Sequence, residues 1–216
     1  MKALLSAQTL PTDDLTSRSH GVAGWIANPS ALGAPWPSGA PPLYLTVDDL
    51  DAKGVDDALA RAARHGAAGV LLRRLRASAD IERLAARLAV AEARAGSADG
   101  ALAIVALVAG AAGLLALPAL AGRRPRLAAL GWDAAALAAD LGAAEARDPC
   151  GGWIEPLRHA RSQVLFAAAA LDVPAIDAPA DLDDEAFAAE AALGLRHGFR
   201  AKIALSPRQA EILAAL

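Results

Sequence analysis

The sequence contains little cysteine, few aromatic residues and no large excess of either charge. Its single cysteine, Cys150, excludes an internal disulfide and fits a reducing compartment, so we expect a cytoplasmic protein. Only 4% of the residues are aromatic, so the core must be built from small aliphatic side chains. A net charge of −3 without a basic stripe argues against nucleic-acid binding. The sequence also lacks a phosphate-binding loop, zinc-ligand spacing and a dinucleotide fingerprint.

Long runs that are both uncharged and mostly apolar are rare as well, and one of them raises the question of a membrane segment. Residues 101–121 (ALAIVALVAGAAGLLALPALA) carry no charge, and the run is long enough to cross a bilayer as a helix. Gly110, Gly113 and Pro118 interrupt it, and it divides into a β-rich part and an alanine-rich helical part. We therefore expect a buried strand followed by a helix, and no membrane association.

The length of 216 residues suits one domain that spans residues 1–216. Short apolar runs alternate with Ala/Leu-rich segments, which is typical of βαβ units and a parallel sheet. The pattern predicts strands at residues 3–7, 21–27, 42–47, 68–72, 102–108, 126–130, 173–176 and 200–205. It predicts helices at residues 13–20, 55–65, 78–95, 111–121, 156–171, 183–197 and 207–216. Residues 28–41 are rich in Pro, Gly and Ser, so a loop is expected there.

Two short repeats mark the corners between helices and strands. Arg64-His65-Gly66 and Arg196-His197-Gly198 each stand at the end of a predicted helix and just before a predicted strand. Glycine supplies the left-handed conformation that ends a helix, and a cation in the last turn complements the helix dipole. Both histidines therefore receive a structural explanation.

Several separate motifs resemble the citrate lyase β-subunit-like branch of the HpcH/HpaI aldolase family. They are GVLLRRLRASADI (69–81), VALVAGAAGLLAL (105–117), GWDAAALAADLG (131–142), ARDPCGGWIEPLRHARSQVLFAAAALDVPAID (146–177) and GFRAKIALSPRQAEIL (198–213). The resemblance implies a single (β/α)8 TIM-type barrel, here of class α/β with a shortened N-terminal part. It also implies cleavage or formation of carbon–carbon bonds in short acids or acyl-CoA thioesters, with Mg²⁺ as cofactor.

The resemblance places alanines where the family holds its metal. The family's Glu after the fifth strand corresponds to Ala109, and its Asp after the sixth strand corresponds to Ala136. A hard divalent cation needs carboxylate oxygens, so we expect a degenerate metal site and no bound cofactor. Asp133 is a weak candidate for a displaced ligand, and its alternative role is to cap a helix. The family's substrate-clamping Arg on the third strand corresponds to Thr46.

Four cations are candidates for binding an anionic substrate: Arg73, Arg74, Arg147 and Lys202. Arg73 and Arg74 follow a predicted strand, at the end where barrel active sites lie. Alternatively, both arginines lie in a solvated loop and bind no ligand. Arg147 could instead pair with Asp148 or order its own loop. Lys202 lies within the last strand, where it faces either the barrel interior and mouth or outward, toward an acid on a helix.

Two functions fit these observations. The first is a divergent carbon–carbon lyase that acts on a short oxo- or hydroxy-acid, a dicarboxylate or an acyl-CoA thioester, without the usual metal site. The second is a non-catalytic relative that binds a ligand or serves as an assembly subunit beside an active paralogue. Whether the chain is an enzyme thus stays open at this point. By the same resemblance, we expect a homo-oligomer.

Overall fold

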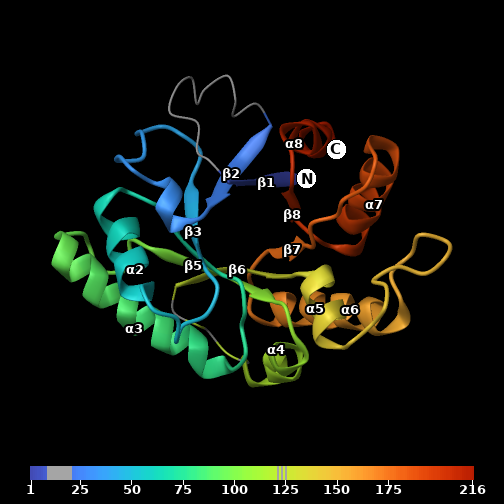
Figure 1. Cartoon of the computed structure of the whole chain (residues 1–216), viewed down its shortest axis with the longest axis horizontal. Coiled ribbons are helices and arrows are strands. Elements are labelled where there is room, and N and C mark those ends of the chain that lie inside the picture. Colours follow the sequence, from blue (N-terminus) through green and yellow to red (C-terminus); the bar gives the residue numbers. More distant parts are fainter. Residues whose placement is uncertain (9–20, 121, 123, 125) are drawn as a thin grey trace.

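Eight parallel strands form a closed barrel in the computed structural model, which describes residues 1–8, 21–120, 122, 124 and 126–216 (Figure 1). The strands follow the order of the chain around the barrel. They are β1 (Lys2–Ala7), β2 (Val22–Ala27), β3 (Leu43–Val47), β4 (Gly69–Leu72), β5 (Ala103–Val108), β6 (Leu127–Trp132), β7 (Ala175–Asp177) and β8 (Ala201–Ala204). All eight predicted strands are therefore confirmed.

The barrel closes where the last strand meets the first. β8 pairs in parallel with β1, with Lys2 opposite Ala201 and Leu5 opposite Ala204. Closure leaves no strand with unpaired backbone groups along an edge. The predicted TIM-type barrel is confirmed by this pairing.

Helices cover the outside of the barrel (Figure 1). They are α2 (Val55–Arg64), α3 (Ser78–Ala95), α4 (Ala111–Ala116), α5 (Ala134–Asp140), α6 (Glu155–Ala170), α7 (Asp184–His197) and α8 (Pro207–Ala214), with two short 3-10 helices, η1 (Pro29–Ala31) and η2 (Leu117–Leu120). The bounds of α5 were not predicted, because its seven residues are mostly alanine and carry little apolar periodicity, although a helix capped by Asp133 was one of the two alternatives for that residue.

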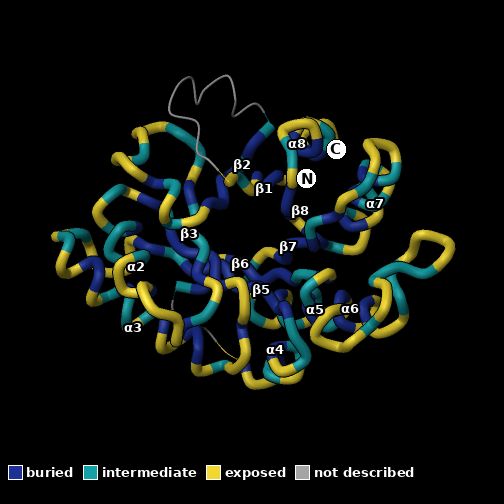
Figure 2. Tube along the Cα trace, in the orientation of Figure 1, coloured by how far each residue is buried: buried dark blue, intermediate teal, exposed yellow. Residues whose placement is uncertain are grey.

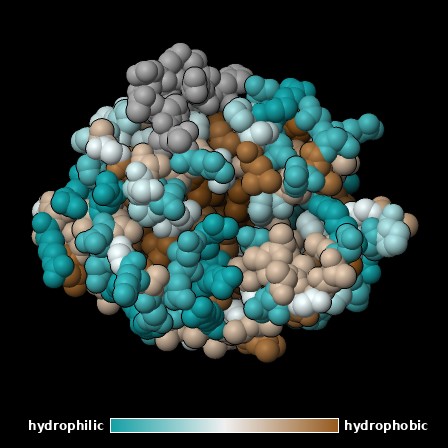
Figure 3. Space-filling view, in the orientation of Figure 1, coloured by the Kyte–Doolittle hydropathy of each residue, from teal (hydrophilic) through white to brown (hydrophobic). Residues whose placement is uncertain are grey.

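The core has an inner and an outer part. The inner part fills the barrel with one or two side chains from each strand, among them Leu4, Leu71, Leu107 and Ile203. The outer part is larger and lies between the sheet and the helices. Figure 2 shows buried residues along the strands and on the inner sides of the helices, and Figure 3 shows hydrophobic side chains recessed beneath a largely hydrophilic surface.

The uncharged run at residues 101–121 is divided between a strand and a helix, as predicted. Gly110 has an extended backbone (φ −164°) and ends the strand segment before α4 begins. The regular α-helix ends at Ala116 and continues as η2, which contains Pro118. Proline has no backbone N–H to donate, which favours an early end of the α-helix. In the described residues, no helix combines the length and the apolar character that a membrane span requires.

The N-terminal part of the barrel is reduced between β2 and β3. Only η1 stands where a full helix would complete a βα unit, and the side chain of Asn28 accepts a hydrogen bond from the Ser30 N–H at its start. The proline- and glycine-rich composition of this segment explains the missing helix. The helix predicted at residues 13–20 lies outside the described residues.

Candidate functional site at the barrel mouth

The mouth of the barrel is formed where the strands end. Side chains alternate between the two faces of a strand. Leu71 and Leu107 point into the barrel, so Arg73 and Ala109, two residues further along the chain, are directed to the mouth. Active sites of this fold lie at this end of the barrel.

Arg73 is the central cation of the mouth. Its Nε lies 3.7 Å from Oδ1 of Asp48, and its Nη2 lies 3.8 Å from Oδ2 of Asp133. The Arg73 side chain is half exposed, whereas that of Asp133 is only 14% exposed. A guanidinium is always charged and presents several donors, so Arg73 retains the capacity to bind an anion from solution.

Asp133 uses its other oxygen to begin α5. Its Oδ1 accepts a hydrogen bond from the N–H of Ala136 at 3.0 Å, which is the capping role expected as the alternative to metal binding. Ala109 is buried, and its methyl group, like that of Ala136, offers no oxygen ligand. Among the described residues, no cluster of three or more His, Cys, Asp or Glu side chains has the arrangement of a metal site.

Arg74 is exposed and makes no ion pair with the described residues. It lies close enough to Asp49 to affect that carboxyl. The backbone N–H of Asp51 is the main cause that lowers the pKa of Asp49, and the charges of Arg76 and Arg74 add to it. Arg74 thus follows Arg73 directly after β4 and lies near the carboxylate of Asp49.

Arg147 is engaged by its own loop and by α7. Its Nη1 donates to the carbonyl oxygen of Gly151 at 2.8 Å, and its Nη2 donates to Glu190 at 2.7 Å. The guanidinium also stacks 3.8 Å above the ring of Trp153. Arg147 thus orders its own loop and joins it to α7, and it does not pair with Asp148.

Lys202 does not face the interior or the mouth. Its side chain is fully buried on the outer side of β8, where Nζ donates to Glu190 at 2.9 Å and to the carbonyl oxygen of Ala178 at 2.7 Å. The second of the two predicted orientations, an outward ion pair with a helix acid, is therefore the one observed. A buried ammonium requires such partners because desolvation of an unpaired charge is very costly.

A buried carboxylate, Asp177, is at the centre of the same charge network. Arg161 donates to both of its oxygens (3.2 and 2.8 Å), and the indole N–H of Trp132 donates at 2.9 Å. Lys202 lies 3.8 Å away. Burial alone would raise the pKa of Asp177, but the charges of Lys202 and Arg161 and these hydrogen bonds outweigh burial and lower it.

Arg161, Asp177 and Glu190 were not predicted to be members of one site. A signal was nevertheless present, because Arg147, Arg161, Asp177 and Lys202 all lie in motifs that carry the family resemblance. These matched residues meet under α6 and α7, outside the barrel, where Asp177 and Glu190 are ion-paired with Arg147, Arg161 and Lys202. Their arrangement is that of a structural network.

The comparison with protein families gives one clear match. The model of the HpcH/HpaI aldolase/citrate lyase family matches residues 40–207, which is well over half of the chain. None of the curated proteins compared with the chain matches it significantly.

Solved structures show the same fold at low identity. RipC from Yersinia pestis has a TM-score of 0.73 and 23% identity, covering 100% of this chain and 94% of its own. The citrate lyase beta subunit from M. tuberculosis, complexed with oxaloacetate and magnesium, has a TM-score of 0.81 and 20% identity. The match covers 99% of this chain and 95% of the mycobacterial chain. Protein CitE from the same organism, in complex with magnesium, acetoacetate and coenzyme A, has a TM-score of 0.80 and 20% identity. This match covers 98% of this chain and 79% of the CitE chain. By the extent of the family match, this chain belongs to the HpcH/HpaI aldolase/citrate lyase family.

Proposed function

We propose that the barrel mouth binds a short oxo- or hydroxy-acid, free or as its CoA thioester, and cleaves a carbon–carbon bond without a metal ion. The observation that carries this proposal is the position of Arg73, whose guanidinium lies between the carboxylates of Asp48 and Asp133. The oxo-acids and coenzyme A bound by the mycobacterial relatives support the substrate class.

The residues of the mouth do not fit Mg²⁺. Magnesium requires oxygen ligands in near-octahedral geometry, yet positions 109 and 136 carry methyl groups. Asp133 is engaged as a helix cap, and its second oxygen faces the cation of Arg73. The guanidinium of Arg73 thus places a positive charge beside the carboxylate oxygen that Asp133 could offer to a divalent ion.

Cleavage of a hydroxy-acid needs a base and a positive group. The base removes the hydroxyl proton, the carbon–carbon bond breaks, and its electron pair moves onto the neighbouring carbonyl as an enolate. In this proposal Asp48 accepts the proton and Arg73 stabilises the enolate oxygen by a charge-assisted hydrogen bond. Arg74 binds the substrate carboxylate at the rim of the mouth.

Binding of oxaloacetate tests the role of the two arginines. We expect Arg73→Gln and Arg74→Ala each to weaken binding by about tenfold or more, because each removes a charge-assisted contact. Arg94→Gln, in the last turn of α3, is the matched control and should change nothing. Calorimetric titration measures this, and equal effects of Arg74→Ala and Arg94→Gln would remove the proposed site.

Titration with Mg²⁺ tests the metal-free mouth. We expect no binding in the millimolar range by the natural chain, and measurable binding after Ala109→Glu with Ala136→Asp, since these changes supply two carboxylates. The control pair Ala109→Glu with Ala135→Asp adds the same charge but places the second acid at an exposed position of α5. Tight Mg²⁺ binding by the natural chain that Asp133→Ala abolishes would contradict the proposal.

A non-catalytic ligand-binding subunit is the second candidate function. It is favoured by the same engagement of Asp133 and by the two alanines, since direct metal coordination is the family's way to stabilise the enolate. The two functions differ in one measurement. Release of an oxo-acid from hydroxy-acids or their CoA thioesters in the presence of a chelator supports the metal-free lyase, whereas binding without turnover supports the second candidate.

A further inference from the structure

A groove lies on the outside of the barrel between α6 and α7. It encloses about 880 Å³ and is bordered at one end by the loop of residues 147–153. The two helices follow each other in the chain, and Figure 1 shows them on either side of β7. They do not pack closely, whereas α2 and α3, or α7 and α8, do. The volume is in the range of small-molecule sites.

The groove is lined by more cations than acids. Four arginines contribute to its walls, and Glu190 is the one acid among the described residues that line it. Glu190 is already neutralised by Arg147 and Lys202. Arg158 is balanced by Asp148 and Glu155. Arg161 pairs with Asp177, so Arg196 is the arginine of the groove that has no acid partner among the described residues.

Arg196 and His197 form the end of the groove opposite the loop. Arg196 is exposed and makes no ion pair with the described residues. Nδ1 of His197 lies 2.9 Å from Nη1 of Arg161. A guanidinium can only donate, so Nδ1 accepts this hydrogen bond and the ring hydrogen is on Nε2. An imidazole N–H and a guanidinium are thus available as donors at this end of the groove.

Apolar side chains lie beside this cationic end. Leu193 precedes Arg196 by one helical turn, so the two share a face of α7. Phe166 and Leu165 of α6 line the same groove, and Phe166 is 70% exposed while Leu193 is 41% exposed. Large exposed apolar side chains that are bordered by charges are typical of binding surfaces.

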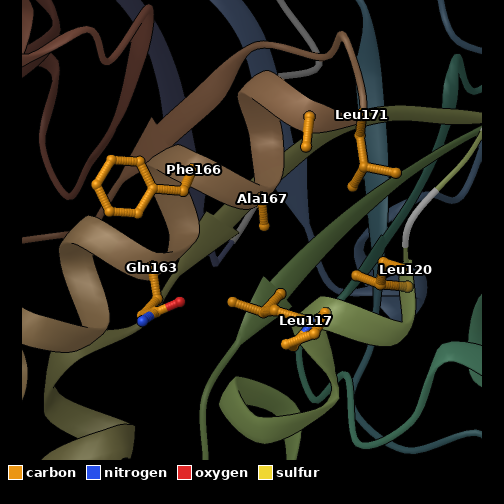
Figure 4. Close-up of a pocket in the computed structure, with 8 residues that line it drawn as sticks. Leu117, Leu120, Gln163, Phe166, Ala167 and Leu171 are labelled. Carbon is orange, nitrogen blue, oxygen red and sulfur yellow. The ribbon is translucent and has the colours of Figure 1, made fainter.

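A second concavity on the other side of α6 offers no comparable chemistry. It encloses about 170 Å³ between α6 and η2 and is lined mostly by apolar residues. Figure 4 shows Leu117, Leu120 and Leu171 there, with the ring of Phe166 pointing away from Leu117 and Leu120. No charged side chain lines it among the described residues, so it does not compete for an anion.

We propose that the groove between α6 and α7 binds a small amphipathic anion, a carboxylate or phosphate monoester on an apolar body. The head contacts Arg196 and His197, and the body lies along Leu193, Leu165 and Phe166. Because the groove is outside the barrel, this proposal does not rest on the function proposed for the mouth.

Calorimetric titration with decanoate, decyl phosphate and the uncharged decanol, below their aggregation concentrations, tests the proposal. We expect one decanoate site per chain and binding of decanol weaker by about tenfold or more, the effect of a lost charge-assisted contact. Decyl phosphate distinguishes a phosphate head from a carboxylate head, and tighter binding of either one supports the site.

Two variants and two matched controls locate the ligand. Arg196→Gln should weaken decanoate binding by about tenfold, and Leu193→Asp should abolish it by placing a negative charge beside the chain. Arg94→Gln is the control for Arg196, since it too lies in the last turn of its helix, and Leu115→Asp is the control at an exposed leucine of α4. Thermal unfolding of each variant verifies the fold.

Three outcomes would overturn the proposal. The first is no decanoate binding by the natural chain, and the second is equal binding of decanol. The third is a loss with Arg73→Gln as large as that with Arg196→Gln, which would place the ligand at the barrel mouth.

Discussion

Replacement of Asp177 by alanine is expected to lower the free energy of unfolding by about 3–5 kcal/mol, the usual effect of breaking a buried ion pair. Asp177 is fully buried, and it accepts hydrogen bonds from Arg161 and Trp132. Its removal leaves the guanidinium of Arg161 without its carboxylate partner inside the protein, while Lys202 keeps Glu190. Urea denaturation measures the change.

The matched control is Asp184→Ala. Asp184 is an exposed acid that pairs with Arg208 on the surface, and exposed pairs contribute little to stability. We therefore expect a much smaller loss for this variant. Similar losses for the two variants would mean that Asp177 is not the centre of the network.

The same carboxyl predicts how stability depends on pH. The pKa of Asp177 is lower in the folded protein than its ordinary value, so its contribution is fully present above the pKa of the unfolded chain, which is about 4. The contribution falls as the pH drops through that value toward the folded pKa, because protonation then favours unfolding. In Asp177→Asn this part of the acid sensitivity should disappear.

Gly113→Ala is expected to destabilise the protein by about 1–3 kcal/mol, as overpacking does. A Cβ at this position would lie 2.1 Å from the backbone oxygen of Leu75, which precedes α3. The sign of the effect is diagnostic. Alanine is the better helix former by about 1 kcal/mol, so helix propensity alone predicts stabilisation within α4. Thermal or urea unfolding distinguishes the destabilisation expected from overpacking from the stabilisation expected from helix propensity.

Gly33→Ala is the control for this substitution. A Cβ at Gly33 would meet no atom within 4 Å, and Gly33 does not have a positive φ. The free energy of unfolding of the Gly33→Ala variant should therefore be close to that of the natural chain. A stabilised Gly113→Ala would show that α4 does not approach Leu75 as closely as the structure places it.

Most of the fold could be predicted from the sequence because it depends on local patterns. The helix at residues 78–95 was predicted with its observed bounds, since its apolar positions repeat with the helical period. Gly66 and Gly198 adopt the left-handed conformation expected of helix ends, with φ of 72° and 114°. Family-like motifs in the right order then indicated the closed barrel.

The direction of side chains on the strands could not be predicted. Strands of a parallel barrel are buried on both faces, so their sequences are apolar throughout and carry no alternation that separates inside from outside. Lys202 was therefore open to two orientations, and only the position of Glu190 on α7 decided between them. Arg147 was likewise open to two roles, binding an anion or ordering its own loop, and nothing in the sequence brings it to Glu190.

By itself, the sequence determined the succession of strands and helices, the ends of several helices and the lack of carboxylates at positions 109 and 136. These properties depend on residue type and on neighbours a few positions away. The tertiary structure alone decided that Arg73 lies between Asp48 and Asp133, that Arg161, Asp177 and Lys202 form one buried network, and that α6 and α7 leave a groove. Each of these joins residues far apart in the chain, and only closure of the barrel brings them within the few ångströms over which charges and contacts act.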